Sequence, residues 1–200
     1  AQSVMDVEEY KDFDITVPNK SLDELVKVMD NFHENVNLYF SVNRLLVKFK
    51  NVLFQTRLLD GNYPDTSRLI PASYPIIIYF NKNELLDAVE RVSLLSPRDK
   101  VGDREIAYSI IKITVTKDNC VEISTNNSMI GDAKEELIPT DTQIAGPIEI
   151  GCSSRYLVEA LRSFDSTEVS LNCSEGIRPF VVKGEKDPNL TQLILPVRMD

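Results

Sequence analysis

The stretch that decides the fold is IEIGCSSRYLVEALRSFDSTEVSLNCSEGIRPFVV, residues 148 to 182. Its ends and its middle carry short runs rich in β-branched residues, and such runs predict strands. Between the first two runs, Leu157, Val158 and Leu161 recur at helical spacing, which predicts a helix over about residues 154–164. The stretch therefore has the order strand, helix, strand, turn, strand.

A second stretch, ITVPNKSLDELVKVMDNFHENVNLYFSVNRLLV at residues 15 to 47, has the same order. Apolar positions match at an offset of 132 residues in Leu25 and Leu157, Val26 and Val158, and Phe32 and Phe164. They match at an offset of 133 in Val36 and Val169, and in Leu38 and Leu171. A period this long indicates two related domains rather than solenoid units of about 20–50 residues.

Further strand signals run along the chain, with turn residues such as KDN and SEG between neighbours. Their short spacing predicts antiparallel meanders and an α+β fold class. The strands are expected at residues 14–17, 37–42, 45–49, 52–59, 76–80, 110–115, 120–125, 148–151, 169–173, 179–183 and 192–197.

Two more helices are predicted, and all three helices are expected to pack on a core. In the first, Ser21 is the expected N-cap and Glu24 completes a capping box. Its inward face would carry Leu22, Leu25, Val26 and Met29. The other spans about residues 83–95 before Ser96-Pro97, with an inward face of Leu85, Leu86, Val89 and Val92.

The composition is that of an ordinary globular chain. Its 200 residues suit one large or two small domains, and no apolar run approaches the ~18 residues of a membrane span. The acidic N-terminal stretch lacks the layout of a secretion signal, so a cytoplasmic protein is expected. The net charge of −9 has the wrong sign for a broad grip on phosphates, so any contact with nucleic acid should be local and weak.

Few residues suggest reactive chemistry. Cys120, Cys152 and Cys173 are odd in number and lack metal-ligand spacing, so buried free thiols are expected. His33 is interpreted as a solvated turn residue, and the acidic pairs, Glu135-Glu136 among them, lack the spacing of a calcium loop. No catalytic motif is present, so a protein without cofactor, metal or catalytic residue is expected. An acidic enzyme that uses carboxylate pairs is a remote alternative.

Two segments suggest a binding surface. The stretch LDGNYPDTSRLIP, residues 59 to 71, is either a linker or a surface formed by Pro64, Arg68 and Leu69. The C-terminal LILPVRMD, residues 193 to 200, is either a fraying strand or a tail that lines an apolar groove.

Four stretches together resemble the beta sliding clamp family of bacterial DNA polymerase III. They are LLDGNYPDTSRLIP, LLDAVERVSLLSP, IEIGCSSRYLVEAL and LILPVRMD, whose order and spacing agree with the family over essentially the whole chain. The resemblance implies a DNA-clamp fold of antiparallel sheets with helices on one face and repeated domains. Residues 1–71 would be the C-terminal half of the middle domain, and residues 72–200 a complete C-terminal domain. The remaining domains would lie upstream of Ala1, and the half-domain should be the less stable part.

The resemblance also implies a function without catalysis. Clamps of this family are homodimeric rings that encircle duplex DNA and give the replicative polymerase its processivity. Helices line the hole, and here their faces mix both signs of charge, which suits weak sliding contact. The cations are Lys20, Lys27, Lys82, Arg91, Arg155 and Arg162, among the anions Asp23, Glu24, Asp87, Glu90 and Glu159.

Family members bind short peptides of DNA polymerase III alpha, clamp loader subunits and repair proteins in a groove between the middle and C-terminal domains. The matching positions are Pro64, Arg68, Leu69, Ser153, Tyr156, Ile177, Pro179, Leu193, Leu195, Pro196, Val197 and Arg198. Val197 departs from the Met of many members, so a less adaptable groove is expected. One wall of the groove would precede Ala1, so this chain should bind a peptide weakly.

Ring closure in the family pairs the C-terminal domain with the first domain of the other subunit. The matching positions are Leu94 and Leu95 with the edge strand at residues 132–137, including Glu135 and Glu136. One of the two adjacent leucines should be exposed, because both cannot face one narrow core stripe. The 200-residue chain is expected to be monomeric or weakly self-associated. The alternative to a clamp is a generic α+β protein-interaction domain without a DNA role.

Overall fold

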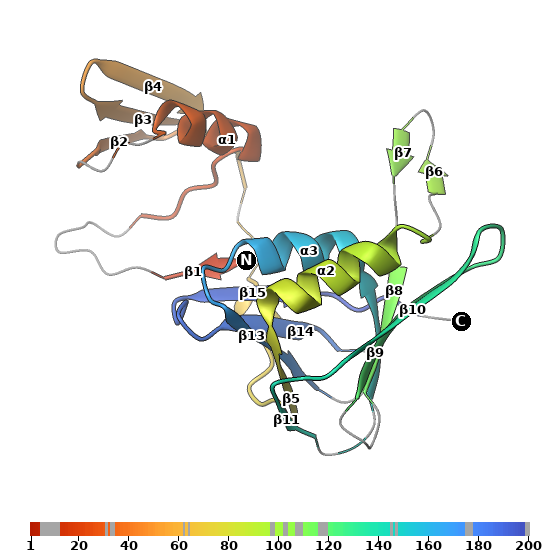
Figure 1. Cartoon of the computed structure of the whole chain (residues 1–200). Helices are drawn as coiled ribbons and strands as arrows, with labels where there is room; N and C mark the ends of the chain where they lie inside the picture. Colours follow the sequence, from red (N-terminus) through yellow and green to blue (C-terminus); the bar gives the residue numbers. More distant parts are fainter. Residues whose placement is uncertain are drawn as a thin grey trace. The chain divides into compact units, whose positions relative to one another are not determined.

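The computed structural model describes residues 1–4, 13–30, 32, 35–61, 63, 65–96, 99–101, 104–106, 110–115, 120–144, 146, 148–174 and 178–198. The chain forms two compact units (Figure 1), a smaller one of Val7–Asp65 and a larger one of Ala1–Asp6 with Thr66–Asp200. The boundary between the middle and C-terminal domains of the family, predicted between residues 71 and 72, stays a prediction.

Two antiparallel sheets form the framework of the larger unit. The six-stranded sheet has the order β1-β15-β14-β13-β5-β11. Its strands are β1 (Gln2–Ser3), β5 (Ile76–Asn81), β11 (Asp141–Gln143), β13 (Glu168–Cys173), β14 (Phe180–Gly184) and β15 (Leu190–Ile194). The four-stranded sheet has the order β10-β9-β8-β12. Its strands are β8 (Ile110–Val115), β9 (Val121–Asn127), β10 (Gly131–Leu137) and β12 (Ile148–Ser153). A separate hairpin joins β6 (Asp99–Val101) to β7 (Arg104–Ile106).

Two helices, α2 (Lys82–Ser93) and α3 (Ser154–Arg162), lie side by side on the larger unit (Figure 1). The Asn81 side chain caps α2, because its Oδ1 accepts hydrogen bonds from the backbone of Asn83 at 3.0 Å and of Glu84 at 3.3 Å. Both helices turn apolar residues inward at the predicted spacing. Leu85, Val89 and Val92 of α2 and Leu157 and Leu161 of α3 are buried, while Leu86 and Val158 pack against the same core.

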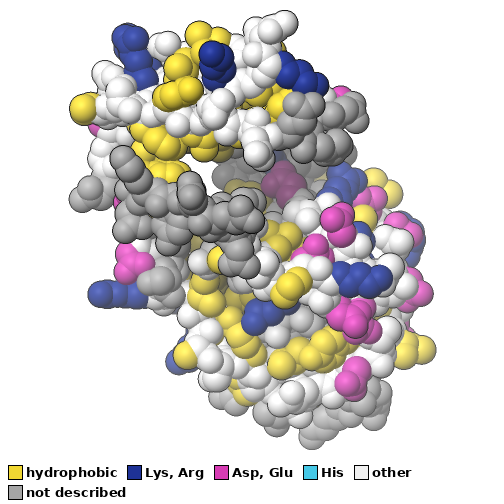
Figure 2. All heavy atoms as spheres, turned by 90° about the vertical axis from the view of Figure 1, so that its left-hand side faces the viewer, with side chains coloured by type: hydrophobic (Ala, Val, Ile, Leu, Met, Phe, Trp, Pro, Cys, Tyr) yellow, Lys and Arg dark blue, Asp and Glu magenta, His cyan; other side chains and the backbone are white. Residues whose placement is uncertain are grey.

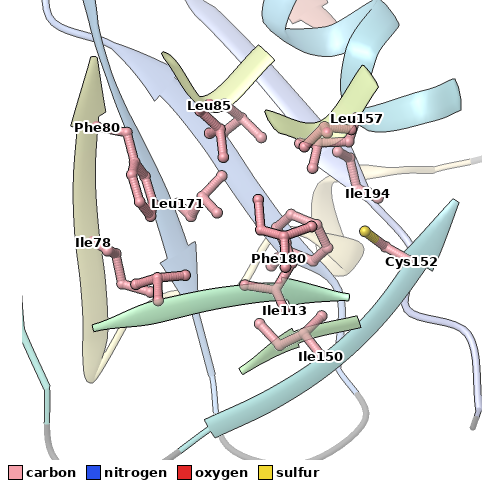
Figure 3. Packing of buried hydrophobic residues seen from close by; sticks show 14 of the residues in the cluster. Ile78, Phe80, Leu85, Ile113, Ile150, Cys152, Leu157, Leu171, Phe180 and Ile194 are labelled. Atoms are coloured by element: carbon pink, nitrogen blue, oxygen red, sulfur yellow. The ribbon is translucent and has the colours of Figure 1, made fainter. Parts of the chain in front are cut away.

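The core of the larger unit lies between the two sheets and beneath the two helices. Figure 3 shows Ile78, Phe80, Leu171 and Phe180 from the six-stranded sheet facing Ile113, Ile150 and Cys152 from the other, with Leu85 and Leu157 of the helices above. On β8 and β9, buried residues alternate with half-buried ones, because successive side chains of a strand point to opposite faces. The predicted antiparallel α+β architecture is confirmed.

The smaller unit is a meander with one helix beside it. Its strands are β2 (Asn37–Ser41), β3 (Arg44–Phe49) and β4 (Val52–Arg57), and its helix is α1 (Asn19–Val28). Three residues of β3, Leu45, Val47 and Phe49, form its buried core. Many other apolar residues stay exposed, among them Val26 at 70% and Leu53 at 64%. Figure 2 shows hydrophobic side chains gathered on this unit.

Two predictions for the smaller unit are wrong. Residues 14–17 form no strand, because within the described part of the chain they pair with no ladder. Leu59 N donates to Thr16 O at 2.8 Å, and Pro18 offers no donor. Ser21 does not cap α1, because the helix begins two residues earlier, after Pro18. The Ser21 Oγ instead accepts a hydrogen bond from Thr56 of β4 at 2.7 Å.

The expected core role of the first helix is confirmed only in part, because α1 packs against the small core but has no fully buried residue. Leu25 and Met29 pack partly against the small core, whereas Leu22 and Val26 are exposed. At the other end of the chain the last strand ends at Ile194, three residues earlier than expected, because Pro196 cannot donate to a ladder.

The cysteines agree only in part with the expectation of buried thiols. Cys152 and Cys173 are buried, but Cys120 is only half-buried. His33 lies outside the described residues.

Candidate functional site

The first part of the predicted groove is a short 3-10 helix, η1 (Ser67–Leu69), which precedes β5. It is closed by a bond from Leu69 N to Thr66 O at 3.1 Å. Arg68 and Leu69 are both exposed, so an apolar and a cationic side chain stand together on the surface of the larger unit. Pro64 lies outside the described residues.

The second part lies where β12 passes directly into α3. Ser153, the last residue of β12, is buried, and Tyr156 in the first turn of α3 is exposed at 57%. Strand and helix follow each other without a loop, so the ring of Tyr156 is presented from a rigid backbone.

The third part is the C-terminal tail, residues 195–198. Val197 N donates a hydrogen bond to Gly151 O of β12 at 2.7 Å. Arg198 lines the same cavity as Glu149, so the tail runs back along the edge of β12. Leu195 is exposed at 60%, Pro196 and Val197 are half-buried, and Arg198 is exposed. The interpretation of this segment as a freely fraying end is therefore not supported.

Two more predicted groove residues lie beside the tail. Phe180 pairs with Ile194, and Val181 pairs with Leu193. Pro179, directly before β14, and Leu193 of β15 are both half-buried and therefore flank the start of the tail. The structure thus brings Ser153, Pro179, Leu193 and residues 195–198 together. Ile177 lies outside the described residues, as does Met199.

The predicted subunit-interface residues are divided between two locations. Leu94, directly after α2, is exposed at 71% and Leu95 is half-buried, as the argument about adjacent leucines predicted. Glu136 is exposed on β10, an end strand of the four-stranded sheet, and pairs with Lys134 at 3.3 Å. Glu135 faces α2 instead and receives two bonds from Arg91, at 2.6 and 2.7 Å. These bonds raise the pKa of Arg91 and lower the pKa of Glu135. Their role in subunit contact stays a prediction.

The α2 and α3 surface carries ion pairs that the sequence analysis did not assign. Arg162 of α3 bonds Glu90 of α2 at 2.6 Å, and Arg155 bonds Glu159 one turn further along α3 at 2.8 Å. The second pair has the i,i+4 spacing that marks such contacts in a sequence. The first joins residues 72 positions apart, and no local signal could have found it.

A cavity of about 1010 Å³ lies over the side of the four-stranded sheet that faces away from the core. Lys112 pairs with Glu149 there, and Lys134 pairs with Glu122 at 2.7 Å. Arg198 is the one predicted groove residue among those that line this cavity, whose walls are otherwise strands β8, β9, β10 and β12. No local sequence pattern marks this surface.

Burial lowers the reactivity of two cysteine thiols. Burial raises the pKa of the Cys152 and Cys173 thiols to about 12 each, so both stay protonated at neutral pH and are poor nucleophiles.

Among the described residues, His, Cys, Asp and Glu side chains form no group of three that could hold a metal ion. None of the helices that the structure describes has the length and apolar character of a membrane crossing.

Two family models match the chain. The model described as "DNA polymerase III beta subunit, central domain" matches residues 1–65, and that of the C-terminal domain matches residues 67–198. The beta sliding clamp of Staphylococcus aureus is 38% identical over 193 residues, which cover 96% of this chain and 48% of the relative. The chain therefore spans about half the length of the curated relatives it matches.

Solved structures show the same similarity. The DNA polymerase sliding clamp of Bacillus subtilis has a TM-score of 0.85 and 34% identity, covering 98% of this chain and 49% of that one. The beta chain of DNA polymerase III from Streptococcus pneumoniae has a TM-score of 0.88 and 31% identity, covering 99% and 50%.

Proposed function

Since this chain belongs to the DNA polymerase III beta subunit family, we propose that it works as part of a sliding clamp. In this role it encircles duplex DNA as part of a ring and lends the replicative polymerase its processivity. It makes and breaks no covalent bond, and it works in the cytoplasm, where a bacterial chromosome is replicated. An excess of negative charge is compatible with this role, because a closed ring is retained on DNA without gripping it.

The proposed docking site is a groove to which η1, the first turn of α3 and the C-terminal tail each contribute. The observation that carries it is the bond from Val197 N to Gly151 O, which holds the tail beside Ser153 and the start of α3. Leu69, Tyr156 and Leu195 offer exposed apolar surface, and Arg68 and Arg198 offer cationic groups. Apolar walls with a few polar groups are typical of peptide-binding sites. The proposed ligands are short motifs of polymerase, clamp-loader and repair proteins.

A peptide-binding measurement tests this proposal. A fluorescent peptide with a glutamine followed by leucine and phenylalanine is titrated with the chain, and anisotropy is recorded. Saturable binding is expected, and Arg68→Ala and Tyr156→Ala should each weaken it by about tenfold or more, since truncating a hot-spot residue of an interface costs about 2 kcal/mol or more.

Two matched variants control for unspecific loss. Arg57→Ala removes an exposed arginine of β4, and Ile138→Ala truncates an exposed side chain after β10. Both should bind the peptide as the unmodified chain does. Equal binding by all four variants would favour the generic interaction domain over the clamp.

A further inference from the structure

The surface formed by α2 and α3 carries equal numbers of opposite charges. Four cations, Lys82, Arg91, Arg155 and Arg162, stand against four anions, Glu84, Asp87, Glu90 and Glu159. The whole chain has a net charge of −9, so the remaining surface carries the entire excess. On electrostatic grounds the two helices therefore repel a polyanion less than the average surface of the chain does.

Every cation of this surface is already bonded within the protein. Arg91 holds Glu135 at 2.6 Å, Arg162 holds Glu90 at 2.6 Å, and Arg155 holds Glu159 at 2.8 Å. The Lys82 Nζ donates to the backbone oxygen of Phe164 at 2.7 Å. Three of the four cations are therefore each paired with a carboxylate, and the fourth, Lys82, is held by a backbone oxygen.

These pairs remain accessible to a ligand. The Arg91, Arg155 and Arg162 side chains are exposed at 58%, 68% and 63%. Figure 2 shows Lys and Arg beside Asp and Glu on the surface of the larger unit. Exposed ion pairs are weak in water, so a phosphate can approach each arginine, but the paired carboxylate stays next to it.

We propose that Glu90, Glu135 and Glu159 pair with the arginines of α2 and α3 and thereby keep the attraction between these arginines and the phosphates of duplex DNA weak. This inference rests on the proposed clamp function and adds its positioning residues. A phosphate that contacts one of these arginines is repelled by the carboxylate on the same guanidinium. The net attraction per contact is then small, and so is the dependence of binding on salt.

The test is to remove the carboxylates and keep the arginines. The helix-face variant combines Glu90→Gln, Glu135→Gln and Glu159→Gln. Its binding to a labelled blunt duplex is measured by anisotropy over a salt series from low ionic strength. We expect tighter binding than for the unmodified chain, with the slope of log K against log salt steeper by up to about 2.7, or about 0.9 for each freed arginine.

A control variant changes the net charge by the same amount at a different place. It combines Asp132→Asn, Asp141→Asn and Glu185→Gln, three exposed carboxylates that form no ion pair with a cation among the described residues. We expect a much smaller gain from this variant. Adding Arg162→Gln to the helix-face variant should reverse about one third of the gain in slope. Thermal melting of each variant checks that the fold is kept.

Equal gains from the helix-face and control variants would overturn the inference, since the effect would then come from net charge alone. An unchanged affinity of a folded helix-face variant would overturn it as well. Neither result bears on the peptide measurement. A chain that binds the peptide yet shows equal gains contradicts the inference alone, whereas a chain that binds no peptide contradicts the proposed function.

Discussion

At the scale of single residues, the most constrained place is the joint between the end of α3 and the turn after β14. The Asp187 carboxylate accepts bonds from Ser166 Oγ at 2.5 Å, Ser166 N at 3.0 Å and Asp165 N at 3.3 Å. These bonds, those from Ser166 first, lower the pKa of Asp187. Ser166 Oγ in turn accepts a bond from Lys186 N at 2.7 Å. The joint fixes the end of α3 to the six-stranded sheet.

Gly184 lies inside this joint and leaves no room for a side chain. A Cβ at this position would lie 2.5 Å from Ser166 Oγ, 2.6 Å from Asp187 Oδ2 and 2.8 Å from Phe164 Cδ1. We therefore expect Gly184→Ala to lower the free energy of unfolding by about 1–3 kcal/mol, the usual effect of overpacking. Urea unfolding measures this change.

Gly146→Ala is the matched control, because a Cβ at Gly146 meets no atom within 4 Å. It should leave stability unchanged or raise it slightly through the unfolded chain. A Gly184→Ala protein as stable as the control would show that the joint relaxes without cost.

At the scale of elements, the two copies of the repeat differ in how they use their helix. In the larger unit, α3 buries Leu157 and Leu161 completely against two sheets. In the smaller unit, α1 has one three-stranded sheet beside it, and Leu25 is only half-buried. The same apolar spacing therefore contributes much more burial in α3 than in α1.

A matched pair of truncations measures this difference. Leu157→Ala should lower the free energy of unfolding by about 2–5 kcal/mol, as core truncations do. Leu25→Ala, at the equivalent position of the repeat, should cost less than about 1 kcal/mol. Urea unfolding followed by circular dichroism gives both values, and equal losses would contradict the assigned burial.

The smaller unit also exposes apolar side chains on its sheet. Leu38, Tyr39 and Phe40 of β2 are exposed, as is Leu53 of β4. Few buried contacts and an open strand edge mark a segment that opens easily. The expectation that this is the less stable part of the chain is a prediction that hydrogen exchange can check.

At the scale of the whole molecule, the proposed ring needs more domains than these residues supply. The two family models account for residues 1–65 and 67–198 as central and C-terminal domains. The resemblance implies that ring closure in the family joins the C-terminal domain of one subunit to the first domain of the other. We therefore expect that the end strand β10 and the exposed Leu94, which match the ring contact of the family, do not pair with a second copy of these 200 residues.

We expect the 200-residue chain to be monomeric for this reason. Light scattering on a size-exclusion column should give a mass near 22.6 kDa over a range of concentrations. A stable dimer that persists on dilution would mean that β10 or another edge pairs in a way the clamp proposal does not include.

Much of the fold was predictable from the sequence because its signals are local. Alternating apolar residues marked β8 at Ile110–Val115 with both ends correct, and helical spacing marked the inward faces of α2 and α3. The repeat indicated two related units, and the resemblance placed Ser153, Pro179, Leu193 and the tail in one site. The structure brings these last residues together through the bond from Val197 to Gly151 and the pairing of β14 with β15.

Tertiary structure alone decided the rest, because the deciding contacts join residues far apart in the chain. Residues 14–17 have the composition of a strand but lack a partner ladder, and Ser21 bonds Thr56 across 35 positions instead of capping a helix. Arg162 and Glu90 were visible as opposite charges but not as a pair. Propensity and spacing act within a few residues, whereas ion pairs, close approaches such as that at Gly184, and burial depend on which elements the fold places side by side.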